Sequence, residues 1–157
     1  MVPAPSFSHQ YFALELAVAL RKIAKARDLV VVNKVGLMNP SRDDDSDYRQ
    51  PDVAVVDLAH ASRRGVEGRA ELVVEVLSPR DESREKLEFY AMCEVQEVWL
   101  VDPQTRAFEV YSLRGRDYFV VGPDRDGVVH APVLAVALSV VDGPKLRIAW
   151  SDRSEDV

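Results

Sequence analysis

The apolar residues of this chain occur in short runs rich in β-branched side chains, and this pattern limits what the chain can fold into. Such runs include residues 29–32, 53–56 and 133–138. Runs of this length are typical of buried strands, whereas a membrane-spanning helix needs about 20 apolar residues. We therefore expect strands at residues 29–37, 52–58, 71–78, 97–102, 108–113, 118–121 and 145–150, and a further short strand at residues 128–130.

Two segments carry helical signals. A helix over residues 8–27 is predicted by apolar residues that recur at the spacing of one helix face: Phe12, Leu16, Leu20 and Ile23. Ser78 followed by Pro79 resembles a helix start, with a capping serine before a proline in the first turn. The second helix is therefore expected over residues 78–93.

The order of these elements is one helix, three strands, a second helix and then further strands. It predicts an α/β (α+β) fold in which one mixed β-sheet is flanked by helices. The 157 residues fit a single domain, expected over residues 1–150 with a disordered tail at residues 151–157. The one cysteine, Cys93, excludes a disulfide framework and a cysteine-based zinc site, and it is typical of a cytoplasmic protein.

Charge and motifs exclude several classes of function. The net charge of −6 argues against a protein that coats nucleic acid, because such binding needs many clustered basic side chains. It leaves room for a nuclease with a local carboxylate cluster. The chain has no phosphate-binding loop, dinucleotide fingerprint or nucleophile elbow, and its three histidines form no zinc motif. The acidic residues 43–47 lack the glycine and glutamate of a calcium loop and are interpreted as solvated surface.

Three polar residues stand where packing would not place them. Asp52 begins an expected strand, Glu75 interrupts an apolar strand, and Lys86 lies on the helix that follows. Carboxylates on adjacent strands can share one divalent cation, and Mg²⁺ prefers such oxygen ligands. Plainer interpretations also fit: Asp52 as a turn cap, Glu75 as a buried partner of Arg49 or Arg80, and Lys86 as a solvated lysine.

Four blocks of sequence, in this order, resemble the Uma-type endonuclease family: Pro51-Asp52, Glu75-Val-Leu-Ser-Pro79, Glu85-Lys-Leu-Glu-Phe-Tyr90 and Glu97-Val-Trp-Leu-Val-Asp-Pro103. That family belongs to the PD-(D/E)XK nucleases, so the resemblance implies a restriction-endonuclease-like core and a metal-dependent phosphodiesterase. It also implies that Asp52 and Glu75 are metal ligands, with the backbone carbonyl of Val76 as a third.

The resemblance bears on two further residues. The superfamily's Glu-x-Lys pattern has Leu77 at the lysine position, so Lys86 is the expected substitute, because a helix packed on this strand could direct its ammonium to the same site. His9, just before the first apolar residue of the predicted helix stripe, matches a histidine often seen there in the family. It either approaches the metal site or caps the helix, and we favour the cap.

The leading hypothesis is a Mg²⁺- or Mn²⁺-dependent endonuclease that acts on nucleic acid, with DNA favoured and no membrane partner. Asp52, Glu75 and Lys86 are its expected catalytic residues. The rival hypothesis is a catalytically inactive nuclease-like scaffold for binding or assembly, and it is motivated by the acidic charge and the missing motif lysine. A homodimer is expected as well, because cutting both strands of a duplex usually needs two sites.

Overall fold

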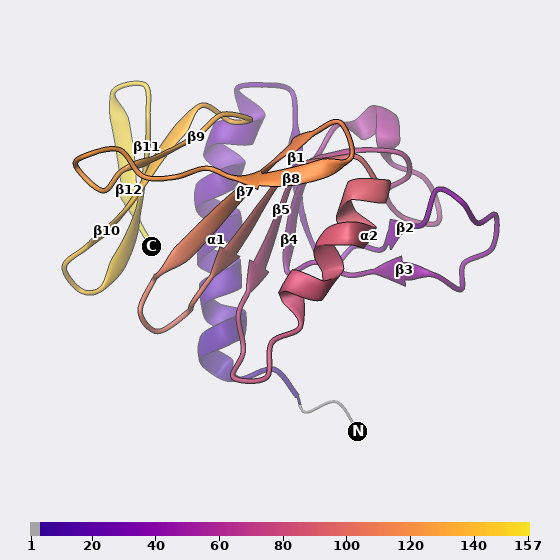
Figure 1. The fold of residues 1–157 in the computed structure, drawn as a ribbon, viewed down its shortest axis with the longest axis horizontal. Helices are drawn as coiled ribbons and strands as arrows, with labels where there is room; N and C mark the ends of the chain where they lie inside the picture. Colours follow the sequence, from indigo (N-terminus) through magenta and orange to yellow (C-terminus); the bar gives the residue numbers. More distant parts are fainter. Residues whose placement is uncertain (1–3) are drawn as a thin grey trace.

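The computed structural model describes residues 4–157, so the first three residues of the expected domain lie outside the described residues. Its centre is a six-stranded sheet (Figure 1). Of its five neighbouring strand pairs, β5–β6 is parallel and the other four are antiparallel. The strand order is β1 (Val30–Asn33), β4 (Val53–Val56), β5 (Ala70–Val76), β6 (Val95–Val101), β7 (Phe108–Arg114) and β8 (Asp117–Val120). The mixed sheet expected for an α+β fold is confirmed.

A helix covers each face of this sheet. α1 (Phe7–Lys25) packs on one face through the apolar stripe predicted from the sequence. α2 (Leu87–Met92) lies in the crossover between β5 and β6 and packs on the other face. A short hairpin of β2 (Leu37–Met38) and β3 (Tyr48–Arg49) adds to that second face. Among residues 4–157, no helix combines the length and apolar character that crossing a membrane needs.

Alternating side chains give the sheet two separate cores. Leu72 and Val74 of β5 pack with the residues of α1, whereas Val73 between them packs with those of α2. Because both faces of β4, β5 and β6 are buried, these strands are mostly apolar rather than alternately polar. Glu75 continues the series of Val73, so its side chain belongs to the α2 face.

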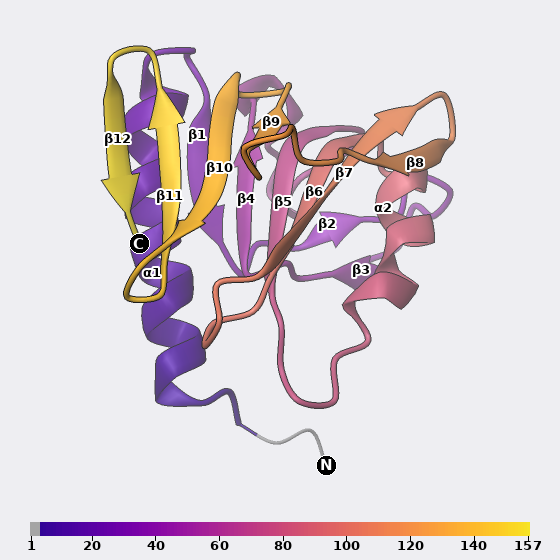
Figure 2. The same ribbon diagram turned by 60° about the vertical axis from the view of Figure 1, so that its left-hand side comes forward.

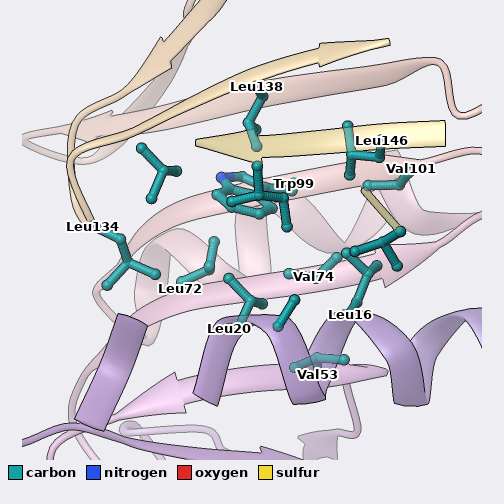
Figure 3. Close-up of a cluster of buried hydrophobic side chains, with 14 of the residues drawn as sticks. Leu16, Leu20, Val53, Leu72, Val74, Trp99, Val101, Leu134, Leu138 and Leu146 are labelled. Carbon is teal, nitrogen blue, oxygen red and sulfur yellow. The ribbon is translucent and has the colours of Figure 1, made fainter. Parts of the chain in front are cut away.

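A second sheet packs beside α1 on the same face of the central sheet (Figures 2 and 3). Its antiparallel order is β12 (Arg153–Asp156), β11 (Lys145–Trp150), β10 (Val136–Val141) and β9 (Val129–Ala131). The expectation of a single sheet is therefore wrong for the last strands. The physical reason is coverage: α1 spans only part of its face, and the remainder, around Trp99, is buried by apolar residues of this small sheet.

The tail at residues 151–157, expected to be disordered, is ordered. β12 pairs with β11 along its whole length. Val157 exchanges two backbone hydrogen bonds with Leu146, of 2.8 and 2.9 Å, and the guanidinium of Arg147 donates two hydrogen bonds to Asp156. The polar composition of the tail concealed a strand because an edge strand is held by backbone pairing rather than by a buried apolar face.

The second helix begins later than predicted, at Leu87 rather than at Ser78. A 3-10 turn, η2 (Ser83–Lys86), precedes it. Ser78 caps nothing: its N–H and that of Ser83 donate to the carboxylate of Asp81, at 3.0 and 2.5 Å. An aspartate that binds nearby backbone N–H groups stabilises a turn in competition with a helix, and this accounts for the late start.

One buried carboxylate, that of Glu97 in β6, links the two sheets. Its Oε1 accepts a hydrogen bond of 2.7 Å from the indole of Trp99, and its Oε2 accepts one of 3.1 Å from the N–H of Val133, just before β10. Burial raises the pKa of Glu97 above its ordinary value, while the two hydrogen bonds act in the opposite direction.

We expect the Glu97→Gln variant to gain stability relative to the wild type as the pH rises. Because the Glu97 pKa is higher in the folded protein, its contribution to folding is fully present below the unfolded-state pKa of about 4.3 and is lost as the pH rises through the folded-state pKa. Glutamine does not titrate. Urea unfolding of both proteins between about pH 4 and pH 8 measures the difference, and a difference that is independent of pH would contradict the expectation.

Candidate active site

Two buried carboxylates lie opposite one another at one end of the central sheet. Asp52 immediately precedes β4, and Glu75 is the last residue but one of β5. Val53 of β4 pairs with Val74 of β5, and these strands are antiparallel. The adjacent residue pair is therefore Asp52 and Glu75, which lie opposite each other. Only 4% of each acidic side chain is exposed. The N-terminal end of α1 and the loop that leaves β5 lie at this same end, at the bottom of Figure 2.

Contacts to both carboxylate oxygens hold Asp52 in place. The N–H of Val76 donates to Oδ2 at 2.8 Å, and the ammonium of Lys34 donates to Oδ1. Lys34 lies one position beyond Asn33, which pairs with Val53 across β1 and β4. The sequence around Lys34 does not mark it as a site residue, because its approach to Asp52 depends on the pairing register of two strands, and the local pattern does not specify that register.

His9 reaches the same place from α1. Its Nε2 lies 2.8 Å from the carbonyl oxygen of Val76 and 3.4 Å from Oδ2 of Asp52. The side-chain amide of Gln10 lies 3.4 Å from Nδ1, so we assign the ring proton to Nε2, which donates to Val76. The favoured capping role is wrong: Ser6 caps α1 by accepting the N–H of His9. His9 therefore approaches the acid pair.

Glu75 accepts hydrogen bonds from two side chains of the following helical segment. Nζ of Lys86 lies 3.1 Å from Oε1, and the hydroxyl of Tyr90 donates to the same oxygen. Lys86 and Tyr90 are four residues apart, so they share one helix face. The structure thus brings Lys86 to Glu75, as the sequence predicted. Within the described part of the chain, Glu75 forms no ion pair with Arg49 or Arg80.

The electrostatics of the pair follow from its burial. Burial raises the pKa of Glu75, the negative charge of Asp52 raises it further, and Lys86 and Tyr90 act in the opposite direction. Burial and the neighbouring Glu75 raise the pKa of Tyr90, so its hydroxyl stays protonated as a donor. The sequence did not assign Tyr90 to the site. Its helical spacing from Lys86 was the signal that could have assigned it to the site.

The donor atoms determine which metal the site could hold. Within residues 4–157, no three His, Cys, Asp or Glu side chains gather into a metal-binding group. Mg²⁺ at phosphate-processing sites is commonly held by one or two carboxylates, with waters and substrate phosphates completing its shell. Asp52 and Glu75 fit that pattern. The carbonyl of Val76, the expected third ligand, accepts a hydrogen bond from His9 and would have to exchange it to bind a cation.

Comparisons with known proteins agree with this architecture. A family model described as "Uma2: Putative restriction endonuclease" matches residues 1–141. The chain is also similar to a solved structure described as a "putative nuclease belonging to DUF820" from Anabaena variabilis. The two share 19% identity with a TM-score of 0.62, over 85% of this chain and 76% of the other. At this identity the likeness concerns the fold. The curated proteins contain no match to the chain.

We expect Lys86→Met to lower the free energy of unfolding by about 1–3 kcal/mol, because a buried Glu75 carboxylate would keep only Tyr90 as a side-chain donor. The same substitution should cost less in a Glu75→Gln background, where no buried charge is left. Urea unfolding of the four proteins in this double-mutant cycle measures the coupling, with Lys145→Met, at an exposed position of β11, as the control. Additive effects would contradict the expectation.

Proposed function

Because the chain belongs to the Uma2 family, we propose that it is an endonuclease that uses Mg²⁺ or Mn²⁺ to hydrolyse phosphodiester bonds of nucleic acid, with DNA as substrate. The observation that carries this proposal is the buried pair of Asp52 and Glu75, each in contact with a lysine ammonium. Burying charge is costly and is not needed for packing an apolar sheet. Such a pair at a sheet end therefore supports a chemical role.

In this proposal Asp52 and Glu75 hold the divalent cation, which when bound supplies a Lewis acid for the phosphoryl oxygen and an activated water. The other residues orient these two ligands. The N–H of Val76 fixes one oxygen of Asp52, and the hydroxyl of Tyr90 fixes one oxygen of Glu75. His9 lies against both Asp52 and the Val76 carbonyl, so it restrains the positions of these two groups. Val76, Tyr90 and His9 are positioning groups.

Lys86 supplies an ammonium in place of the superfamily's strand lysine. Glu75 engages one of its three N–H donors, which leaves two for the oxygens of a phosphate. The side chain is 32% exposed, so a substrate arriving from solvent can reach it. A fixed cation at that position stabilises the negative charge that develops on phosphate oxygens during hydrolysis.

We expect Asp52→Asn and Glu75→Gln each to reduce cleavage of a DNA duplex in Mn²⁺ more than about 100-fold, because each replaces a charged ligand by a neutral amide of the same shape. Lys86→Met should reduce the rate by about 100- to 1,000-fold, through loss of its stabilising charge. Initial rates on a labelled duplex measure these effects.

The matched control for the acid variants is Glu97→Gln, which neutralises a buried carboxylate of the same sheet on its opposite face. It should keep the wild-type rate. Cleavage by Asp52→Asn at the wild-type rate would show that Asp52 is not a ligand or that the activity comes from another protein.

The rival function is the catalytically inactive scaffold, favoured by Leu77 at the position of the motif lysine. Calorimetric titration with Mg²⁺ and Mn²⁺ separates the two functions. Mn²⁺ binding that is lost in Asp52→Asn and kept in Glu97→Gln supports the nuclease. A wild type that neither binds these metals in the presence of DNA nor cleaves it supports the scaffold.

We also propose that the protein is a homodimer joined through an exposed apolar stripe on α1. Phe7, Tyr11, Leu14 and Val18 follow one another at intervals of four, three and four residues, and are 49–84% exposed. This spacing is the seam pattern of paired helices. Two copies would bury roughly 1,000 Å² of apolar surface, near the lower limit for a specific interface. A dimer would supply an active site for each strand of a duplex.

We expect light scattering to give twice the chain mass of 17.6 kDa for the wild type and the single-chain mass for Leu14→Glu, because a carboxylate within the seam would lose its water on association. Leu58→Glu is the matched control: Leu58 is 64% exposed but lies away from the stripe, in η1 (Leu58–His60). A wild type with the mass of one chain would rule out the dimer.

A further inference from the structure

Lys34 contacts the acid pair at the carboxylate that Lys86 does not reach. Its ammonium donates to Oδ1 of Asp52, whereas Lys86 donates to Oε1 of Glu75. We propose that Lys34 is a second phosphate-binding residue of this site, which holds the nucleic-acid backbone together with Lys86. This inference rests on the proposed function, because it assumes that a phosphodiester approaches the acid pair.

The backbone conformation at Lys34 and two nearby side-chain amides support this contact with Asp52. Lys34 has a φ of +51°, in the left-handed region that non-glycine residues seldom adopt. This conformation ends β1 directly opposite Asp52. Two side-chain amides brace the turn: that of Gln50 donates to the carbonyl of Lys34 at 3.3 Å, and that of Asn33 donates to the carbonyl of Asp52 at 3.2 Å.

Exposure and donor count leave Lys34 free to bind a second group. Its side chain is 44% exposed, compared with 32% for Lys86. An ammonium has three N–H donors and Asp52 accepts one, so two are available to phosphate oxygens. The two lysines cancel the charges of Asp52 and Glu75. Without Lys34 the group would carry a net negative charge and would repel a phosphate.

A purely structural role for Lys34, as a counter-ion that only stabilises Asp52, predicts a different result. Removing its charge would then change the stability of the fold but not the number of phosphate contacts. The dependence of DNA affinity on salt reports that number, because each neutralised phosphate releases condensed counterions. The salt slope therefore separates the two roles.

The experiment measures binding of a fluorescent DNA duplex by anisotropy, in EDTA and over a series of NaCl concentrations. Lys34→Gln keeps a hydrogen-bond donor beside Asp52 but removes the charge. It should weaken binding and lower the slope of log K against log salt by about 0.9, the value for one lost phosphate contact. Lys34→Arg keeps the charge and should restore the wild-type slope. If Lys34→Gln does not fold, Lys34→Met is measured in the same way.

Lys145→Met, at an exposed position of β11 in the second sheet, is the control and should leave the slope unchanged. A wild-type slope in Lys34→Gln, with DNA binding and cleavage intact in the wild type, would overturn the role of Lys34 and leave the proposed function standing. DNA binding in EDTA without cleavage when Mn²⁺ is supplied would overturn the nuclease, and the slope would still decide the role of Lys34. A wild type that neither binds DNA in EDTA nor cleaves it in Mn²⁺ would overturn both.

Discussion

The arrangement of this site depends on one constraint, which is that two carboxylates on adjacent strands are buried. Asp52 and Glu75 face each other at the end of a sheet whose central strands are mostly apolar, and each is nearly excluded from water. Two negative charges in such a place need cations and hydrogen-bond donors close by. The fold supplies them from separate elements: Lys34 from the end of β1, Lys86 from η2, and backbone and side-chain donors from β5 and α2.

The position of the site follows from how the sheet is covered. α1 and the four-stranded sheet bury one face, and α2 and the β2–β3 hairpin bury the other. The acid pair lies at one end of β4 and β5, beside these covering layers. The first turn of α1 brings His9 to this end, and the parallel crossover from β5 to β6 returns Lys86 and Tyr90 to the same end from the opposite face.

The residues that sequence reasoning found are those whose surroundings along the chain were anomalous. Glu75 stood out because a carboxylate interrupted an apolar strand, and Lys86 followed from the family's order of motifs. Lys34 and Tyr90 gave no such signal: a lysine after a strand and a tyrosine on an amphipathic helix are ordinary features. The tail at residues 151–157 was missed for a related reason, because an edge strand needs only a partner's backbone and no apolar pattern of its own.

The sequence by itself determined the mixed sheet, the helix over most of residues 8–27, and the two acids of the candidate site. This is because buried strands and helix faces require apolar residues at regular spacings, and a charged residue that interrupts such a pattern stands out. Tertiary structure alone decided which residues meet those acids. Strand register set Lys34 against Asp52, and the packing of α1 turned His9 toward Val76. It also split the last strands into a second sheet, since covering the face around Trp99 is a requirement of the whole fold.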